Sequence, residues 1–157
     1  MSTTEVPGFT PAEILTGEPT RAARLKWVIV VDRDLPVGRL ANAVACVAAS
    51  TGNLVGGLIG PPSPDASGHQ HPGLPWAGCT LLAADATELA ELREKTVASE
   101  GVLLVEMPIL AQQVRVYDEY QAGLAETKPA DLANCALSIV GPRNRVSKLV
   151  KRLVLLP

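Results

Sequence analysis

Short aliphatic runs alternate along the chain with segments whose apolar positions recur at helical spacing. The runs lie at residues 27–31, 79–84, 102–105 and 135–140. Strands buried on both faces of a sheet read as continuous apolar runs, so these segments predict four β-strands. The apolar residues 153–156 could add a short final strand.

The first predicted helix covers residues 38–50. Its Leu40, Val44 and Val47 share one face, and the opposite face is lined with alanine at positions 41, 45, 48 and 49. Small residues allow another element to approach closely. We therefore expect this helix to be enclosed on most sides.

Three further helices are indicated between and after the other runs. Asp85 and Glu88 have the spacing of a capping box, which predicts a helix from residue 85 to about Ser99. Pro108 begins a segment with helical spacing as far as Leu124. A basic helix at residues 143–152 ends the pattern.

Strands that alternate with helices predict a single three-layer α/β domain over residues 25–157. We expect a four-stranded, mostly parallel or mixed sheet. Residues 1–24 are rich in proline and glycine and predict an appendage with one short helix, which starts at Thr10. Residues 51–76 predict a long loop, and loops of that length are usually functional or disordered.

Composition narrows the class of protein. The 157 residues are 47% apolar and 19% charged, which fits one folded domain. No stretch approaches the ~20 apolar residues of a membrane span, and the start lacks a signal peptide, so we expect a cytoplasmic protein. Cys46, Cys79 and Cys135 are widely spaced in aliphatic surroundings, which favours buried free thiols.

Positive charge is concentrated at the C-terminal end. The last 26 residues contain five cations and no acid: Arg143, Arg145, Lys148, Lys151 and Arg152. This pattern is compatible with a nucleic-acid partner, but without interleaved aromatic residues it is weak evidence for one, and a solvated helix face is the favoured interpretation. Arg143 follows Gly141-Pro142 and is a candidate anion-binding residue, or part of an ordinary strand-to-helix turn.

The segment 65–73 (DASGHQHPG) is the most informative part of the long loop. It contains both histidines of the protein, His69 and His71, and the carboxylate of Asp65. An imidazole oriented by a carboxylate can act as a general acid or base. A structural loop and a metal site are the alternatives, but three donors are too few for a closed metal site.

Two further residues are candidate ligand contacts. Asn42 interrupts an apolar helix that we expect to be enclosed, so its carboxamide needs a partner, which is either a loop backbone or a ligand. Tyr117 is a weaker candidate, because tyrosines of this kind more often belong to the core or its rim. The sequence contains none of the common nucleotide, serine-hydrolase or zinc-protease motifs, and we predict no cofactor and no metal.

Four ordered motifs resemble the bacterial domain-of-unknown-function family 2000. They are KWVIVVDRDLPVGRLANAVA, DASGHQHPG, VRVYDEYQAGL and SIVGPRNRVSKLVKRLVLL, and the resemblance covers residues 25–156. That family is similar in fold to the second, archaeal and eukaryotic type of peptidyl-tRNA hydrolase. The resemblance therefore implies a mixed four-stranded sheet.

The catalytic residues of that hydrolase are absent from this chain. Alanines 41, 45 and 48 stand where its lysine, glutamine and histidine are expected. Its aspartate-alanine-glycine-x-threonine motif corresponds at best to residues 121–125 (QAGLA), which lack both polar groups. The resemblance thus excludes standard peptidyl-tRNA hydrolysis. The hydrolase has no segment that corresponds to the histidine segment of this chain.

Two hypotheses follow. In the first, the protein is a hydrolase or acyl transferase for a small ester or amide, with His71 as base, Asp65 orienting it, His69 nearby and Asn42 donating to the substrate. This scheme requires the histidine segment to fold over the alanine-lined face of the first helix. In the second, the protein is a non-catalytic binding or regulatory module for a small metabolite, a peptide or tRNA, either as a single chain or as a homodimer.

Overall fold

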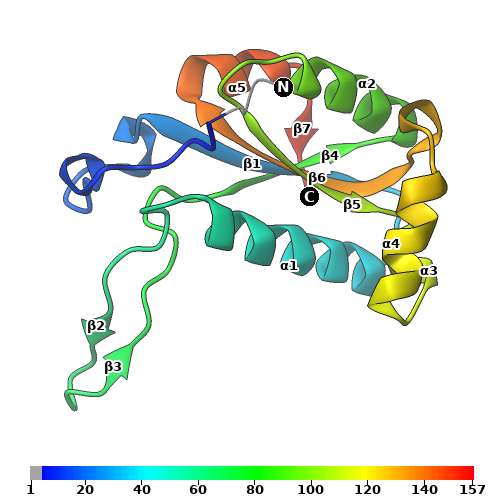
Figure 1. Ribbon diagram of the computed structural model, residues 1–157. Coiled ribbons are helices and arrows are strands. Elements are labelled where there is room, and N and C mark those ends of the chain that lie inside the picture. Colours follow the sequence, from blue (N-terminus) through cyan, green and yellow to red (C-terminus); the bar gives the residue numbers. More distant parts are fainter. Residues whose placement is uncertain (1–4) are drawn as a thin grey trace.

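The computed structural model describes residues 5–157 and contains one mixed five-stranded sheet (Figure 1). The strand order is β5-β6-β1-β4-β7. Only β1 and β4 are parallel, and the other neighbours are antiparallel. The strands are β1 (Leu25–Asp32), β4 (Thr80–Ala84), β5 (Leu103–Pro108), β6 (Asn134–Pro142) and β7 (Val154–Leu155).

The sheet has five strands instead of the four expected, and the fifth, β7, is the short final strand that residues 153–156 were expected to allow. Two register pairs join β7 to β4, Leu82 with Leu155 and Ala83 with Val154. Both residues of β7 are exposed, so it lacks the buried apolar run of the other strands. The four predicted strands are present, with bounds within a few residues of those expected.

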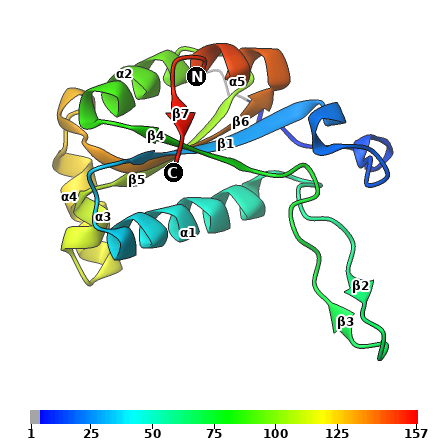
Figure 2. The same ribbon diagram turned by 180° about the vertical axis from the view of Figure 1, so that it is seen from behind.

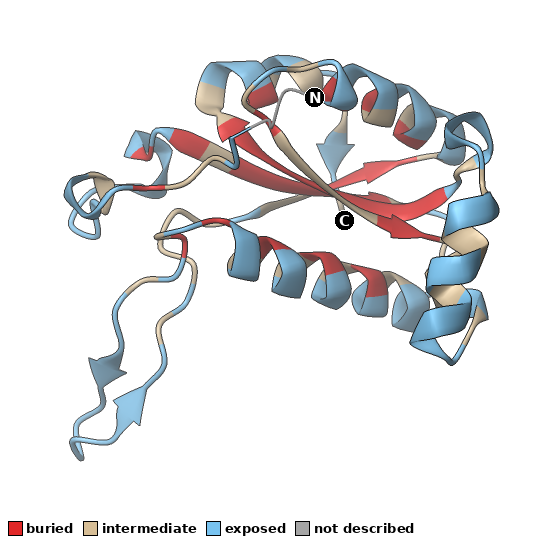
Figure 3. Cartoon of the chain, in the orientation of Figure 1, coloured by how far each residue is buried: buried red, intermediate tan, exposed pale blue. Residues whose placement is uncertain are grey.

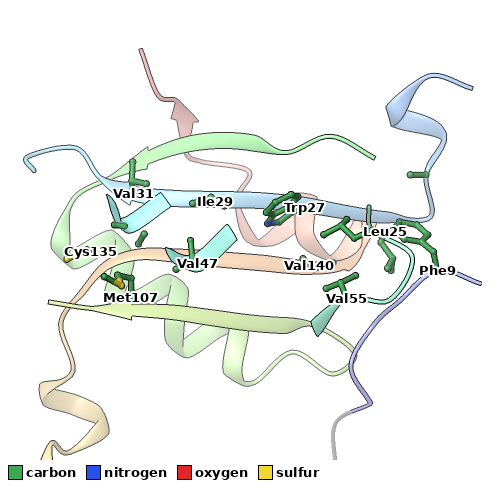
Figure 4. Packing of buried hydrophobic residues seen from close by; sticks show 14 residues of the cluster. Phe9, Leu25, Trp27, Ile29, Val31, Val47, Val55, Met107, Cys135 and Val140 are labelled. Carbon is green, nitrogen blue, oxygen red and sulfur yellow. The ribbon is translucent and has the colours of Figure 1, made fainter. Parts of the chain in front are cut away.

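The sheet separates two apolar clusters, as expected for strands buried on both faces (Figure 3). Trp27, Ile29 and Val31 of β1 face the cluster that helix α1 (Val37–Leu54) covers (Figure 4). Val28 and Val30 face the opposite cluster, under α2 (Ala86–Val97) and α5 (Arg143–Leu149). This alternation produces the three layers of the domain.

A buried polar network ties α1 to the sheet. Ser138 of β6 accepts a hydrogen bond from Trp27 Nε1 at 2.8 Å, and its hydroxyl lies 2.7 Å from that of Thr51. The Thr51 hydroxyl donates in turn to the carbonyl of Val47, also at 2.7 Å. Because all these groups have partners, their burial costs little.

Helix α1 differs from its prediction in length and environment. It continues to Leu54 instead of residue 50, because Thr51 belongs to the core-facing side and is held by the network. The alanine-lined face is not enclosed: Ala41, Ala45 and Ala49 are exposed to solvent. The expectation of a second element on this face was wrong for the described chain.

The later helices are shorter than predicted. The helix expected over residues 108–124 is divided into α3 (Leu110–Gln113) and α4 (Tyr117–Glu126), with extended backbone at Val114 and Val116. The capping box of Asp85 and Glu88 is confirmed at the start of α2. Helix α5 ends at Leu149, three residues before the end of the predicted basic helix.

The N-terminal segment packs against the body through the aromatic residue Phe9. It forms two single-turn 3₁₀ helices, η1 (Pro11–Glu13) and η2 (Thr20–Ala22). Phe9 is 8% exposed, stacks at a tilt on Trp76 with ring centroids 4.8 Å apart, and donates its N–H to the carbonyl of Gly56.

Part of the predicted loop forms a two-stranded arm that projects away from the body (Figures 1 and 2). Its strands are β2 (Ser63–Pro64) and β3 (Gln70–His71), and every residue from 61 to 72 is exposed. At its root the N–H of Gly60 donates to the carbonyl of Leu74. None of the described helices is long and apolar enough to cross a membrane.

Candidate functional site

The tip of the arm brings Asp65 and His71 together, as predicted. The Oδ2 atom of Asp65 lies 3.1 Å from Nε2 of His71. Its Oδ1 atom accepts from the backbone N–H and hydroxyl of Ser67 and from the backbone N–H of His69. Such local bonds are typical of Asx turns, so the short sequence 65–71 specifies this geometry by itself.

These bonds have a clear electrostatic effect on Asp65. They favour its ionised form, and the pKa of the carboxyl falls from 3.8 to about 2, with the Ser67 hydroxyl as the main cause and His71 next. The rings of His69 and His71 meet edge to face with centroids 5.1 Å apart. The arm therefore carries a carboxylate–imidazole pair with an ionised carboxylate at neutral pH.

The Asp65–His71 pair is exposed to solvent. The side chain of His71 is 59% exposed and that of Asp65 is 42% exposed. The arm leaves the body at the C-terminal end of α1 and does not fold over the alanine-lined face (Figures 1 and 2). The expected covering of that face by the histidine segment was therefore wrong within one copy of the chain.

Asn42 lies near the other end of α1 and is exposed. Its Oδ1 atom accepts a hydrogen bond from Nε2 of Gln112 in α3 at 3.1 Å, and the same Nε2 donates to the carbonyl of Arg39. Asn42 thus connects two helices instead of contacting the histidines. The structure joins Asp65 and His71 but not Asn42.

A cavity of about 370 Å³ lies between α1, the edge strand β5 and the α3–α4 segment. Its wall is mostly aliphatic, with two tyrosines and few polar groups. Apolar concavities with a few polar groups are the usual form of small-molecule sites. The lining residues are Cys46, Val47, Ser50, Val105, Glu106, Met107, Ala111, Val114, Arg115, Val116, Tyr117 and Tyr120.

The polar groups of the cavity differ in whether they already have partners. Glu106 forms an ion pair with Arg93 and accepts a hydrogen bond from Asn134. Arg115 makes no ion pair or hydrogen bond with the described residues. The one strong polar group left for a ligand at this cavity is therefore a cation.

The tyrosines form the outer wall of the cavity. Tyr117, one of the predicted candidates, is 71% exposed, and its ring centroid lies 5.6 Å from that of Tyr120. Burial, and to a lesser degree the neighbouring Tyr117, raise the pKa of Tyr120. Tyr120 consequently presents a neutral hydroxyl donor at pH 7, and both rings offer aromatic surface.

Arg143 has a structural role in the fold. Its guanidinium donates to the carbonyls of Ala23 and Thr20 at 2.9 and 3.0 Å, and so fastens the N-terminal segment to the start of α5. These bonds occupy donors that an anion would need. The anion-binding role predicted for Arg143 receives no support from this geometry.

The remaining cations line a wider groove between α2 and α5. Arg145, Lys148, Lys151 and Arg152 share it with the acids Glu88, Glu91 and Glu100. Because both signs of charge are present, the groove lacks the uniform positive field of a nucleic-acid site. Among the described residues, no group of three or more His, Cys, Asp or Glu could hold a metal ion.

Most cavity residues were missed by the sequence reasoning. Val47, Val105 and Met107 belong to apolar segments that predict core, and nothing marks them as lining a cavity. The signal that existed was the break between α3 and α4, where Arg115 interrupts the apolar spacing. Cys46 and Cys79 were both expected to be buried but are exposed, Cys46 at this cavity, and Cys135 is buried as expected.

Comparison with known proteins gives a family and a fold. No curated protein matches the chain. The structure of Atu0240, a protein of unknown function from Agrobacterium tumefaciens, is similar with a TM-score of 0.75 and 17% identity, over 85% of this chain and 98% of that one. The likeness to peptidyl-tRNA hydrolase stays a prediction. The family described as "Protein of unknown function (DUF2000)" matches residues 25–157, and the chain belongs to this family, as its four motifs predicted.

Proposed function

We propose that the protein is a non-catalytic binding module whose ligand is a small molecule with an apolar body and an acidic group. The observation that carries this proposal is the aliphatic cavity at β5 with an unpartnered Arg115 in its lining. A volume of about 370 Å³ lies in the ordinary range for small-molecule sites. This is the second of the two hypotheses raised by the sequence.

Each part of the ligand corresponds to a part of the wall. Val47, Val105 and Met107 offer apolar surface, and Tyr117 and Tyr120 offer aromatic faces with a hydroxyl group each. An acidic group would pair with the guanidinium of Arg115, which is suited to a planar carboxylate or a sulfonate. A cationic ligand is disfavoured because Glu106 is already neutralised by Arg93.

The test uses the fluorescent aromatic sulfonate 1-anilinonaphthalene-8-sulfonate as the probe. We expect saturable fluorescence enhancement with one site per chain. Ser50→Trp should abolish it by filling the cavity from the exposed side of α1, because Ser50 lines the cavity and carries no core contact that the change would break.

The charge of the probe is tested separately. Arg115→Gln should weaken probe binding about three- to tenfold, in line with roughly 1 kcal/mol for a partly exposed charge-assisted bond. Arg21→Gln, on the exposed N-terminal segment, removes the same charge away from the cavity and serves as the control. Equal weakening by both variants, or unchanged binding in Ser50→Trp, would contradict the proposal.

The hydrolase or acyl-transferase hypothesis is the second candidate function. It is favoured by one observation, the 3.1 Å contact of Asp65 Oδ2 with His71 Nε2, which leaves Nδ1 of the ring as the atom to exchange a proton. The neighbouring Ser67 hydroxyl is engaged with Asp65. In this scheme His71 would activate water against a small ester, and His69 would have no required role.

Hydrolysis of p-nitrophenyl acetate separates the two histidines. If the Asp65–His71 pair is catalytic, His71→Ala and Asp65→Asn should lower the rate of purified protein at least tenfold, and His69→Ala should change it little. Free imidazole at the same concentration gives the baseline for an unassisted exposed ring. A rate at that baseline, or equal losses in both histidine variants, would remove this candidate.

A further inference from the structure

The arm (residues 61–72) does not pack against any other described element of its own chain. Residues 61–72 are all exposed, and their strands β2 and β3 have two residues each (Figure 3). Ordering such a segment costs backbone entropy, and an isolated two-stranded hairpin is marginally stable in water. An arm of this shape is typical of a segment that packs against another molecule.

The outer face of α1 has the complementary property. It exposes Ala41, Asn42, Ala45, Cys46, Ala49 and Ser50, and no charged residue occurs from position 40 to position 54. Helices that face water normally carry charged residues on the outer side. At the junction with the arm, the aliphatic residues Leu54, Ile59 and Leu74 are 45%, 47% and 79% exposed.

The arm and this helix face lie on the same side of the sheet. Both ribbon views show the arm extending beyond α1, away from the layer of α2 and α5 (Figures 1 and 2). A body placed against the outer face of α1 would therefore also meet the arm. Together the arm, the helix face and the three aliphatic residues comprise about twenty residues, close to the ~20–30 per side of a stable interface.

We propose that the body covering this side is a second copy of the chain, related by a two-fold axis that crosses α1. In such a contact each face meets itself, so a charged face would repel its copy. From position 40 to position 54 α1 carries no charge, and its one charged residue, Arg39, lies at the N-terminal end, where its guanidinium donates to the side-chain oxygen of Gln112. The single charged residue of the arm, Asp65, is already partnered by His71. The charge distribution therefore suits self-association.

The symmetry determines where each arm goes. An axis across α1 pairs the two helices antiparallel, so the C-terminal end of one lies beside the N-terminal end of the other, over a length of ~27 Å. The arm starts at the C-terminal end, and Gln112 bonds fasten α3 to the N-terminal end. Each arm consequently extends beside the α3–α4 segment of the other copy.

This arrangement brings the two candidate sites together. The wall of the cavity contains no histidine from its own chain. In the dimer the Asp65–His71 pair of one copy would stand at the cavity of the other and complete its polar lining. The interface shares Cys46 and Ser50 with the cavity, but sedimentation of the protein without ligand tests the interface whether or not the cavity binds the proposed ligand.

Sedimentation velocity over a concentration series tests the interface. We expect the full chain to be a dimer, and Ala45→Glu to raise the dissociation constant at least tenfold, because the axis places like charges close together. Ala90→Glu on the exposed side of α2 is the matched control and should leave the dimer unchanged. A monomer at all concentrations, or equal behaviour of both variants, would overturn the proposal.

The arm is tested by deletion and by a spin label. Joining Gly60 to Gly73 removes residues 61–72 across a root that is already closed, and should weaken the dimer without altering the circular dichroism of the body. In a Cys46→Ser, Cys79→Ser background, a nitroxide on Ser67→Cys should broaden amide signals of residues 110–120 in an unlabelled, ¹⁵N-enriched copy. A dimer without that broadening would overturn the arm placement.

Discussion

The arm and the cavity are built in opposite ways. Asp65, Ser67, His69 and His71 fall within seven consecutive residues and bond to one another through local turns. The cavity collects residues from α1, β5 and the α3–α4 segment, which are about sixty positions apart. The arm is polar and exposed, and the cavity is mostly aliphatic. The Asp65–His71 pair can be recognised in the sequence, whereas the cavity is formed only when distant segments pack together. The two lie in different regions of one copy.

This difference has an energetic consequence. The arm contributes few buried contacts, so changes in its residues should leave the free energy of unfolding nearly unchanged. The cavity rests on the apolar cluster between α1 and the sheet, where substitutions are costly. The following predictions measure how far the two regions are independent.

The largest effect is expected in the core beneath the cavity wall. Ile29 is 1% exposed in the central strand β1, so Ile29→Ala should lower the free energy of unfolding by about 2–5 kcal/mol. His71→Ala on the arm should leave the urea midpoint unchanged within error. Equal shifts of the two midpoints would show that the arm is part of the cooperative core.

A smaller loss is expected from the polar network that anchors α1. Ser138→Ala leaves the Trp27 N–H without its acceptor in a buried site, which should cost about 1–3 kcal/mol. The tryptophan emission reports the change directly. Ser99→Ala near the surface removes a hydroxyl of the same kind and is the control. An unchanged midpoint in Ser138→Ala would show that the network does not secure α1.

The parts of the fold that could be predicted are those specified locally. The apolar runs gave four strands, and the Asp85–Glu88 spacing gave the start of α2. The end of α1 was missed because Thr51, Gly52 and Asn53 look like helix breakers, whereas Thr51 is held by Ser138, 87 positions away. Strand β7 depends on its pairing with β4, and its own two residues are exposed.

The same limit applies to the candidate site. The Asp65–His71 contact could be predicted because both residues share one short segment. The position of that segment could not, since the arm projects from the body and no contact with another described element of the chain directs it. Alanine at 41, 45 and 49 suggested a covered face, because small residues fit both close packing and simple helix formation. Whether such an alanine face is packed or exposed is decided by contacts with residues outside the helix.

The rates at which the cysteine thiols react with a labelling reagent report how accessible the cavity is. Cys46 and Cys79 are both exposed residues, but partial burial of the Cys79 thiol raises its pKa to about 12. At pH 8 only about one Cys79 in ten thousand is then a thiolate, the reactive form. In dilute, monomeric protein we expect Cys46 to react first with Ellman's reagent, and the anilinonaphthalene sulfonate to slow it. Faster labelling of Cys79 would contradict this order.

The smallest effect is expected at the tip of the arm. Because the pKa of Asp65 is lowered to about 2, the turn is fully formed above pH 3.8 and is lost only as the pH falls through about 2. Ser67→Ala should raise the pKa of the carboxyl more than His71→Ala does, since the Ser67 hydroxyl is the larger cause. Carboxyl ¹³C shifts of Asp65 measure both. The reverse order would mean that His71, and not the turn, holds the carboxylate ionised, and the arm would then be built around its imidazole.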